Sequence, residues 1–129
     1  MAAGPCLRKG HPVSDMSKNQ VLHGGAERLP VRWVNAPLIP MTISRYRVNP
    51  GDKVSMHVHT GKAEYWVVLA GAGIMQLGEQ TLQVSEGDVI FTAPEVPHAL
   101  LNSGTVNLEF LNLVQPVGGV PITTREIAL

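Results

Sequence analysis

Residues 51–71 read Gly-Asp-Lys-Val-Ser-Met-His-Val-His-Thr-Gly-Lys-Ala-Glu-Tyr-Trp-Val-Val-Leu-Ala-Gly, and this stretch decides the fold. His57 and His59 are two residues apart, and on a strand such residues point to the same face, roughly 6.5–7 Å apart. Glu64 follows a short polar break and opens a run of strand-forming residues. Its carboxylate can therefore come back towards the two imidazoles from a neighbouring strand, which indicates a metal site.

A second stretch, residues 87–102, supplies a third imidazole. It opens with a turn at Gly87, continues through an apolar strand and a proline-containing bend, and reaches His98 at the start of another alternating run. Three histidines and one glutamate at strand positions form a coherent ligand set for one divalent transition metal. The predicted ligands are His57, His59, Glu64 and His98.

These two stretches resemble the two motifs of the cupin superfamily. Residues 51–71 match the glycine, histidine and glutamate positions of the first motif, and residues 87–102 match the glycine, histidine and terminal asparagine of the second. The second motif departs from the family at Ala93, where proline is usual, and at Glu95, where glycine is usual. The resemblance implies an all-β protein, a single-domain, jelly-roll-like cupin barrel with the four ligands around one ion.

Composition agrees with one globular domain. The chain has 129 residues, of which 44% are hydrophobic and 16% charged. Ten basic residues balance ten acidic ones, so we expect no binding to nucleic acid or to an anionic membrane. The single cysteine, Cys6, excludes an intrachain disulfide. Because no apolar signal core and no run of ~20 apolar residues is present, we expect a cytoplasmic protein.

The order of turns and apolar runs predicts an N-terminal arm and a barrel. Residues 1–28 show no clear period, and we expect a flexible arm whose His11 and His23 are solvated. Residues 29–129 form the expected barrel domain. Besides the strands of residues 51–71, strands are expected at 31–34, 41–48, 74–77, 81–84, 89–92, 98–102 and 106–114, and the tail 122–129 could add an edge strand.

Alternation along these strands indicates which apolar side chains lie near the ion. Trp66 and Val68 share the face of Glu64. Phe91 and Leu100 are grouped with them. All four belong either to the barrel core or to the apolar wall of a pocket beside the metal.

No acid or base outside the ligand set stands out as catalytic. The weak candidates are Tyr46, Arg45 and Glu95. Arg45 and Tyr46 are adjacent and point to opposite faces, and parity does not say which one faces inward. Arg45 and Arg47 are the basic residues expected near the mouth, so at most one anionic group of a ligand is matched.

The expected ligand set suits an open metal site. Three imidazoles and one carboxylate occupy four positions of an octahedron and leave two for a chelating substrate or for dioxygen. Structural zinc would prefer a closed tetrahedron. Ligand type alone does not choose among iron, manganese, nickel, cobalt, copper and zinc.

Two functions from different classes agree with these residues. The first is a metal-dependent enzyme acting on a small oxygenated molecule, and similar cupins include dioxygenases, decarboxylases, isomerases and lyases. The second is a non-catalytic small-molecule binding or sensing module that uses the metal as ligand anchor. We also predict a homodimer, because exposed sheet edges and the outward-facing Tyr65, Val67 and Leu69 need cover.

Overall fold

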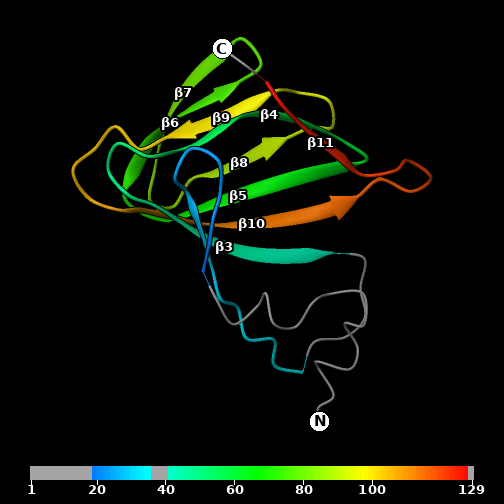
Figure 1. The fold of residues 1–129 in the computed structure, drawn as a ribbon, viewed down its shortest axis with the longest axis horizontal. Coiled ribbons are helices and arrows are strands. Elements are labelled where there is room, and N and C mark those ends of the chain that lie inside the picture. Colours follow the sequence, from blue (N-terminus) through cyan, green and yellow to red (C-terminus); the bar gives the residue numbers. More distant parts are fainter. Residues whose placement is uncertain (1–18, 36–40, 128–129) are drawn as a thin grey trace.

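The described part of the chain, residues 19–35 and 41–127 of a computed structural model, folds into two facing antiparallel sheets (Figure 1). The six-stranded sheet has the order β1-β2-β3-β10-β5-β8, and the five-stranded sheet has the order β11-β4-β9-β6-β7. The strands are β1 (Gln20–Val21), β2 (Glu27–Leu29), β3 (Thr42–Val48), β4 (Lys53–Thr60), β5 (Lys62–Ala70), β6 (Ala72–Leu77), β7 (Gln80–Ser85), β8 (Val89–Thr92), β9 (His98–Leu101), β10 (Leu108–Pro116) and β11 (Thr123–Glu126).

These strands confirm the predicted all-β class. The described residues include no helix long and apolar enough to cross a membrane. Strands expected at 41–48, 74–77, 81–84, 89–92 and 98–102 correspond to β3, β6, β7, β8 and β9. The last long strand, β10, begins at Leu108 rather than at the expected residue 106, and the tail does add an edge strand, β11, which pairs with β4.

One hydrophobic core lies between the two sheets. Trp66, Val68 and Phe110 face inward from the six-stranded sheet, and Met75 and Leu100 face them from the other sheet, each at most 3% exposed. Burying a side chain of this size stabilises the fold by roughly 1.5–3 kcal/mol. The alternation that predicted these strands therefore also determines the core.

Gly61 transfers the chain from one sheet to the other. β4 ends at Thr60 in the five-stranded sheet, and β5 begins at Lys62 in the six-stranded sheet. Gly61 has a φ of 78°, and a Cβ at this position would collide with the carbonyl group of Pro121. The turn places Glu64 on the sheet that faces the histidine strand, not on a strand hydrogen-bonded to it.

The described residues nearest the N-terminus form strands, whereas the sequence predicted a flexible arm. Cys6 and His11 lie outside the described residues, as does everything before residue 19. Residues 19–28, however, include β1 and most of β2, and β2 pairs with β3. Glu27 anchors this pairing, because its carboxylate accepts hydrogen bonds from Asn49 at 2.9 Å and from Arg47 at 3.2 Å.

The strand predicted at residues 31–34 is wrong. Residues 30–35 form no strand in the described structure. Pro30 directly follows β2 and has no N–H group to donate, which ends the pairing there. Asn35 then has a positive φ of 52°, a turn conformation that extended strands do not use.

Candidate metal centre

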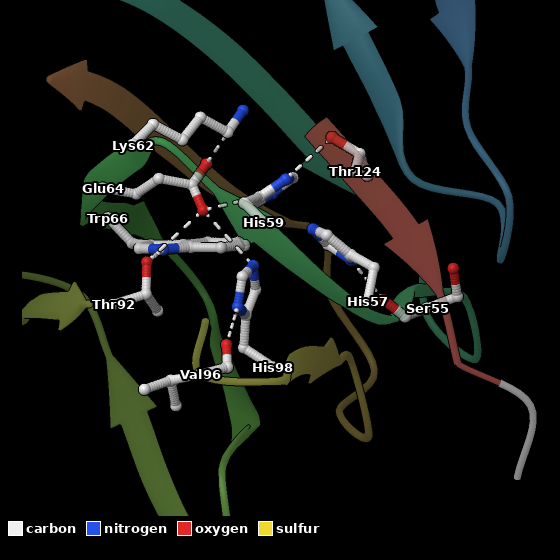
Figure 2. A network of polar contacts seen from close by, with 10 residues as sticks. All are labelled: Ser55, His57, His59, Lys62, Glu64, Trp66, Thr92, Val96, His98 and Thr124. Carbon is white, nitrogen blue, oxygen red and sulfur yellow. Dashed lines mark hydrogen bonds and ion pairs between the residues drawn. The ribbon is translucent and has the colours of Figure 1, made fainter. Parts of the chain in front are cut away.

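Three imidazole rings gather on the inner face of the five-stranded sheet (Figure 2). His57 and His59 project from β4, and His98 projects from β9, where it is the register partner of His57. The ring centroids are 4.3 Å apart for His57 and His98, and 4.6 Å apart for His57 and His59. One ring nitrogen from each residue lies within 4.8 Å of the others, a spacing that suits a single ion.

A β-bulge gives both histidines their inward direction. Pairing of β4 with β9 shifts register between Val54 and His57, so that one more residue lies on β4 than on β9. Val54 therefore packs in the core, while His57 and His59, at odd spacing from it, also face inward. Without the bulge, strict alternation from Val54 would send the two imidazoles outward.

Backbone carbonyl groups orient two of the rings. The Nδ1 atom of His57 is 2.7 Å from the carbonyl oxygen of Ser55, and the Nδ1 atom of His98 is 2.9 Å from that of Val96. A carbonyl oxygen only accepts, so each Nδ1 carries the proton. In the neutral rings the lone pair is then on Nε2, the atom that would bind a metal.

The third ring, His59, is held by a residue from the C-terminal strand. Its Nδ1 atom is 2.8 Å from the hydroxyl oxygen of Thr124 on β11 (Figure 2). A strand more than sixty positions away in the sequence therefore completes the orientation of the cluster. No motif pointed to Thr124; the only signal was the prediction that the tail could pair as an edge strand.

The Glu64 carboxylate reaches the cluster from the facing sheet. Its Oε1 atom lies 3.4 Å from Nε2 of His59 and 3.3 Å from Nε2 of His98. The Nε2 atom of His98 is buried and makes no well-directed hydrogen bond within the described residues. Thr92 donates a hydrogen bond of 3.3 Å to the same carboxylate oxygen and accepts one of 3.1 Å from Trp66.

Burial controls the charge states in the cluster. It lowers the pKa of His59 to about 4, although the carboxylate of Glu64 opposes the shift. It also lowers the pKa of His57. Burial alone would raise the pKa of Glu64, but the contact from His98 and the charges of Lys62 and His59 lower it to about 2. At neutral pH His57 and His59 are thus neutral and Glu64 is ionised, the forms that bind metals.

A cavity of about 410 Å³ opens beside the cluster, a size that suits a small organic molecule. Its wall includes two of the histidines and the glutamate, an aromatic set and several polar residues from both sheets. Among them are His57, His59, Glu64, Tyr46, Trp66, Phe110, Arg28, Lys62, Asn112 and Thr124.

Of the four residues grouped as pocket wall or core, Trp66 alone lines this cavity. Val68 and Leu100 belong to the buried core, at 2% and 1% exposed. The placement of Phe91 in either role is wrong, because Phe91 is 47% exposed and packs against Tyr65 on the outer face, with a centroid distance of 5.1 Å. Ile90 and Thr92, its neighbours on β8, are the residues that face inward.

Of the three weak catalytic candidates, only Tyr46 lines the cavity. Tyr46 lines the cavity and stacks on Phe110 at 5.1 Å, whereas Arg45 is exposed on the opposite face. Glu95 is exposed in the bend before β9 and has a φ of 66°, the left-handed region that glycine favours. The family's usual glycine at this position therefore has a conformational reason.

The cations near the ligand site are not the expected ones. Arg47 pairs with Glu27 at 3.2 Å, so neither Arg45 nor Arg47 faces the cavity. Arg28 and Lys62 line it instead. Sequence reasoning missed Arg28 because it assigned residues 1–28 to an arm, and it missed Lys62 because that residue is in the turn segment before Glu64.

Fold and site together define a class of protein: a small antiparallel β-barrel with a histidine cluster inside and a cavity beside it. Comparison with known families makes this specific. The model of the cupin domain matches residues 44–114, more than half of the chain, and the chain belongs to the cupin family.

The chain matches its curated relatives over only part of their length. The chain is 32% identical over 71 residues to an oxalate-binding protein of Thermotoga maritima and spans 59% of that protein. It is 39% identical over 66 residues to a mannose-1-phosphate guanylyltransferase of Salmonella typhimurium, of which it spans 14%. These matches cover 55% and 51% of the present chain.

Solved structures agree with the fold. A Thermotoga maritima structure described as a predicted oxalate decarboxylase has 31% identity and a TM-score of 0.57, over 58% of this chain and 65% of its own. A cupin 2 conserved barrel domain protein from Salinispora arenicola has a TM-score of 0.64 at 20% identity, over 78% of this chain and 83% of its own. The second likeness shows the fold alone.

Proposed function

We propose that this protein holds one divalent transition metal with His57, His59, His98 and Glu64, and binds a small oxygenated organic molecule in the cavity beside it. One observation carries the proposal: the three imidazoles converge, and two of them line a cavity of about 410 Å³. A purely structural ion would not need a cavity.

The donor set fits such an ion. The Nδ1 protons of His57 and His98 are held by carbonyl groups, which leaves the Nε2 lone pairs for the metal. The buried Nε2 atom of His98 lacks a well-directed partner among the described residues, and a metal would supply one. The same donors do not distinguish among iron, manganese, nickel, cobalt, copper and zinc.

The chain's own residues would bind and orient the organic molecule. A bound ion supplies a Lewis acid that polarises an oxygen atom of the ligand. Trp66 and Tyr46 provide aromatic surface for a carbon skeleton, and Trp66 also holds Thr92 against the Glu64 carboxylate. Through this contact Thr92 keeps the carboxylate directed at His59 and His98.

The similarity to an oxalate-binding protein supports a ligand that chelates through oxygen atoms. Both functional classes stay open under this proposal. The protein is either an enzyme of the dioxygenase, decarboxylase, isomerase or lyase type, or a binding or sensing module that uses the metal as anchor. Turnover of a metal-bound ligand would decide for the enzyme.

Elemental analysis of metal-loaded protein tests the metal centre. We expect about one ion per chain, and we expect the double variant His57→Ala/His98→Ala to lose it. Calorimetry of small diketones, hydroxy acids and oxalate against metal-free and metal-loaded protein tests the ligand. Undiminished metal content in the double variant, or equal ligand binding with and without metal, would contradict the proposal.

We also propose that two copies of the chain pair through the outer face of the six-stranded sheet. β8 is at the edge of this sheet, and β5 lies next to it. Both strands expose apolar side chains outward: Tyr65 is 46% exposed, Leu69 41%, Val89 61% and Phe91 47%. Apolar side chains gathered on one face, next to an open strand edge, favour association with a second copy.

A further inference from the structure

The cavity wall includes two cations that the metal centre does not use. Arg28 projects from β2, and its guanidinium carbon lies 5.9 Å from the ring centroid of Tyr46. Its Nε atom is buried without a hydrogen-bond partner, and no carboxylate of a described residue lies within ion-pair distance of the guanidinium. Lys62, on β5, is only 16% exposed, and its Nζ atom is 4.0 Å from Glu64, the limit of an ion pair.

Asn112 adds a buried amide on the same inner face. It is 5% exposed on β10, where its register partners are Ser44 and Trp66, and it lines the cavity. Its side chain makes no hydrogen bond to another described residue. Because Asn112 lines the cavity, its amide is in position to form a hydrogen bond with a ligand there.

Charge in the cavity favours an anion. The carboxylates on the wall are Glu64, which faces the histidines, and Glu126, which accepts a hydrogen bond of 2.6 Å from Ser55. Arg28 and Lys62 already balance these two groups. Once a divalent ion is bound, positive charge is in excess, and an organic anion would neutralise it.

The geometry points to a carboxylate-binding subsite made by Arg28, Lys62 and Asn112, separate from the metal ligands but on the wall of the same cavity. This inference rests on the proposed function. It specifies the ligand as an organic acid with a chelating oxygen pair at one end and a further carboxylate at the other. The guanidinium matches a carboxylate through paired N–H groups, and Asn112 and Lys62 add single donors.

The test compares acids that share a chelating end and differ in the distal carboxylate. Malate is matched by 2-hydroxybutyrate, and 2-oxoglutarate is matched by 2-oxopentanoate. In calorimetry on the full metal-loaded chain, we expect at least one dicarboxylate to bind about tenfold more tightly than its partner. Arg28→Met and Lys62→Met retain an aliphatic stem and remove the charge, and each should reduce this preference while affinity for the monocarboxylates is unchanged.

Controls separate this subsite from the metal centre. Lys53→Met, at an exposed position on β4, should leave the preference unchanged, and Arg28→Met and Lys53→Met should bind as much metal as the parent. Lys62 lies 4.0 Å from Glu64, so Lys62→Met is compared with the parent only after its metal content has been measured and matched. Asn112→Leu, similar in volume, should also lower dicarboxylate affinity. A parent protein with no preference, or a preference that survives Arg28→Met/Lys62→Met, overturns the subsite even if the ion is bound. Failure to load the ion at all would instead count against the proposed function.

Discussion

At the scale of single residues, the three histidines share one role but are held in three ways. His57 is tied to a carbonyl group two positions before it in a bulge, and His98 to one two positions before it in a bend. Both contacts are local in sequence. His59 depends on the hydroxyl of Thr124, whose strand is distant in the chain, so its orientation is the one most exposed to changes elsewhere in the fold.

Removing the Thr124 hydroxyl should weaken metal binding without removing a ligand. Thr124→Val keeps the β-branched shape and leaves Nδ1 of His59 without its partner, and such losses typically lower metal affinity about 10–100-fold. Competition with a fluorescent chelator measures the change. Thr123→Val is the matched control, because Thr123 bonds with Thr60 at 2.6 Å and does not contact a histidine. Equal affinities for the two variants would show that Thr124 does not position His59.

Acid should destabilise the metal-free protein. The pKa of His59 is about 4 in the native state against 6.5 ordinarily, so between these values the unfolded chain binds a proton that the native chain does not. The free energy of unfolding should therefore fall as pH drops from about 6.5 to 4. The pKa of Glu64 is about 2 in the native state against 4.5 ordinarily, so this residue lowers the free energy of unfolding further below pH 4.5.

Urea unfolding of metal-free protein at several pH values measures this loss. We expect a decrease on the order of 2 kcal/mol between pH 7.5 and 4.5. His59→Gln, which cannot take up the proton, should show a smaller decrease over the same range. A free energy of unfolding that does not change with pH in the parent would contradict the burial of a neutral His59.

At the scale of elements, the bend before β9 positions His98, and it does so with one residue, Glu95, in an unfavourable backbone conformation. Glu95 has a φ of 66°, and its N–H group donates a hydrogen bond of 2.7 Å to the carbonyl of His59, so the bend connects two ligand-bearing segments. The left-handed region costs a residue with a Cβ roughly 1–2 kcal/mol relative to glycine. Backbone hydrogen bonds therefore determine the shape of the bend, although Glu95 itself disfavours this conformation.

Glycine at position 95 should stabilise the fold. We expect Glu95→Gly to raise the free energy of unfolding by about 1 kcal/mol, because the backbone strain is relieved and the exposed carboxylate makes no hydrogen bond or ion pair with another described residue. Chemical denaturation of the metal-free protein provides the measurement. Glu95→Ala keeps the Cβ and should give no gain. A gain of equal size in both variants would mean that the side chain, not φ, is responsible.

At the scale of the whole molecule, the two sheets contribute different residues to the site. The five-stranded sheet contributes the histidines, and the six-stranded sheet contributes Glu64, the aromatic wall and the cations. The outer face of the six-stranded sheet, in contrast, presents apolar side chains of β5 and β8. One sheet thus has an inner face suited to a ligand and an outer face suited to a partner.

Charge on this outer face should break the proposed homodimer. Light scattering of the parent at micromolar concentration is expected to give the mass of a dimer. Tyr65→Glu/Phe91→Glu places two carboxylates where these rings pack together, and it should give a monomer. Val106→Glu is the control, since Val106 is 62% exposed outside the strands. A monomeric parent would rule out this pairing.

Much of the candidate site could be predicted because it depends on local patterns. Alternation places His57 and His59 on one face of a strand, and one turn brings the chain back at Glu64. His98 then faces His57 from the neighbouring strand. Phe91 was misplaced because a short apolar strand of four residues gives no reference for which parity faces inward. Its orientation depends on the pairing of β8 with β5, a contact between residues distant in the sequence.

By itself the sequence determined the barrel class, most strands after residue 41 and the four candidate ligands, because backbone alternation and turn conformations act over a few residues. Only the tertiary structure decided that Glu64 approaches from the facing sheet, that a bulge turns His57 inward, and that Thr124 and Arg28 join the site from the two ends of the described chain. These features depend on how strands far apart in the sequence pair and pack, and no local pattern carries that information.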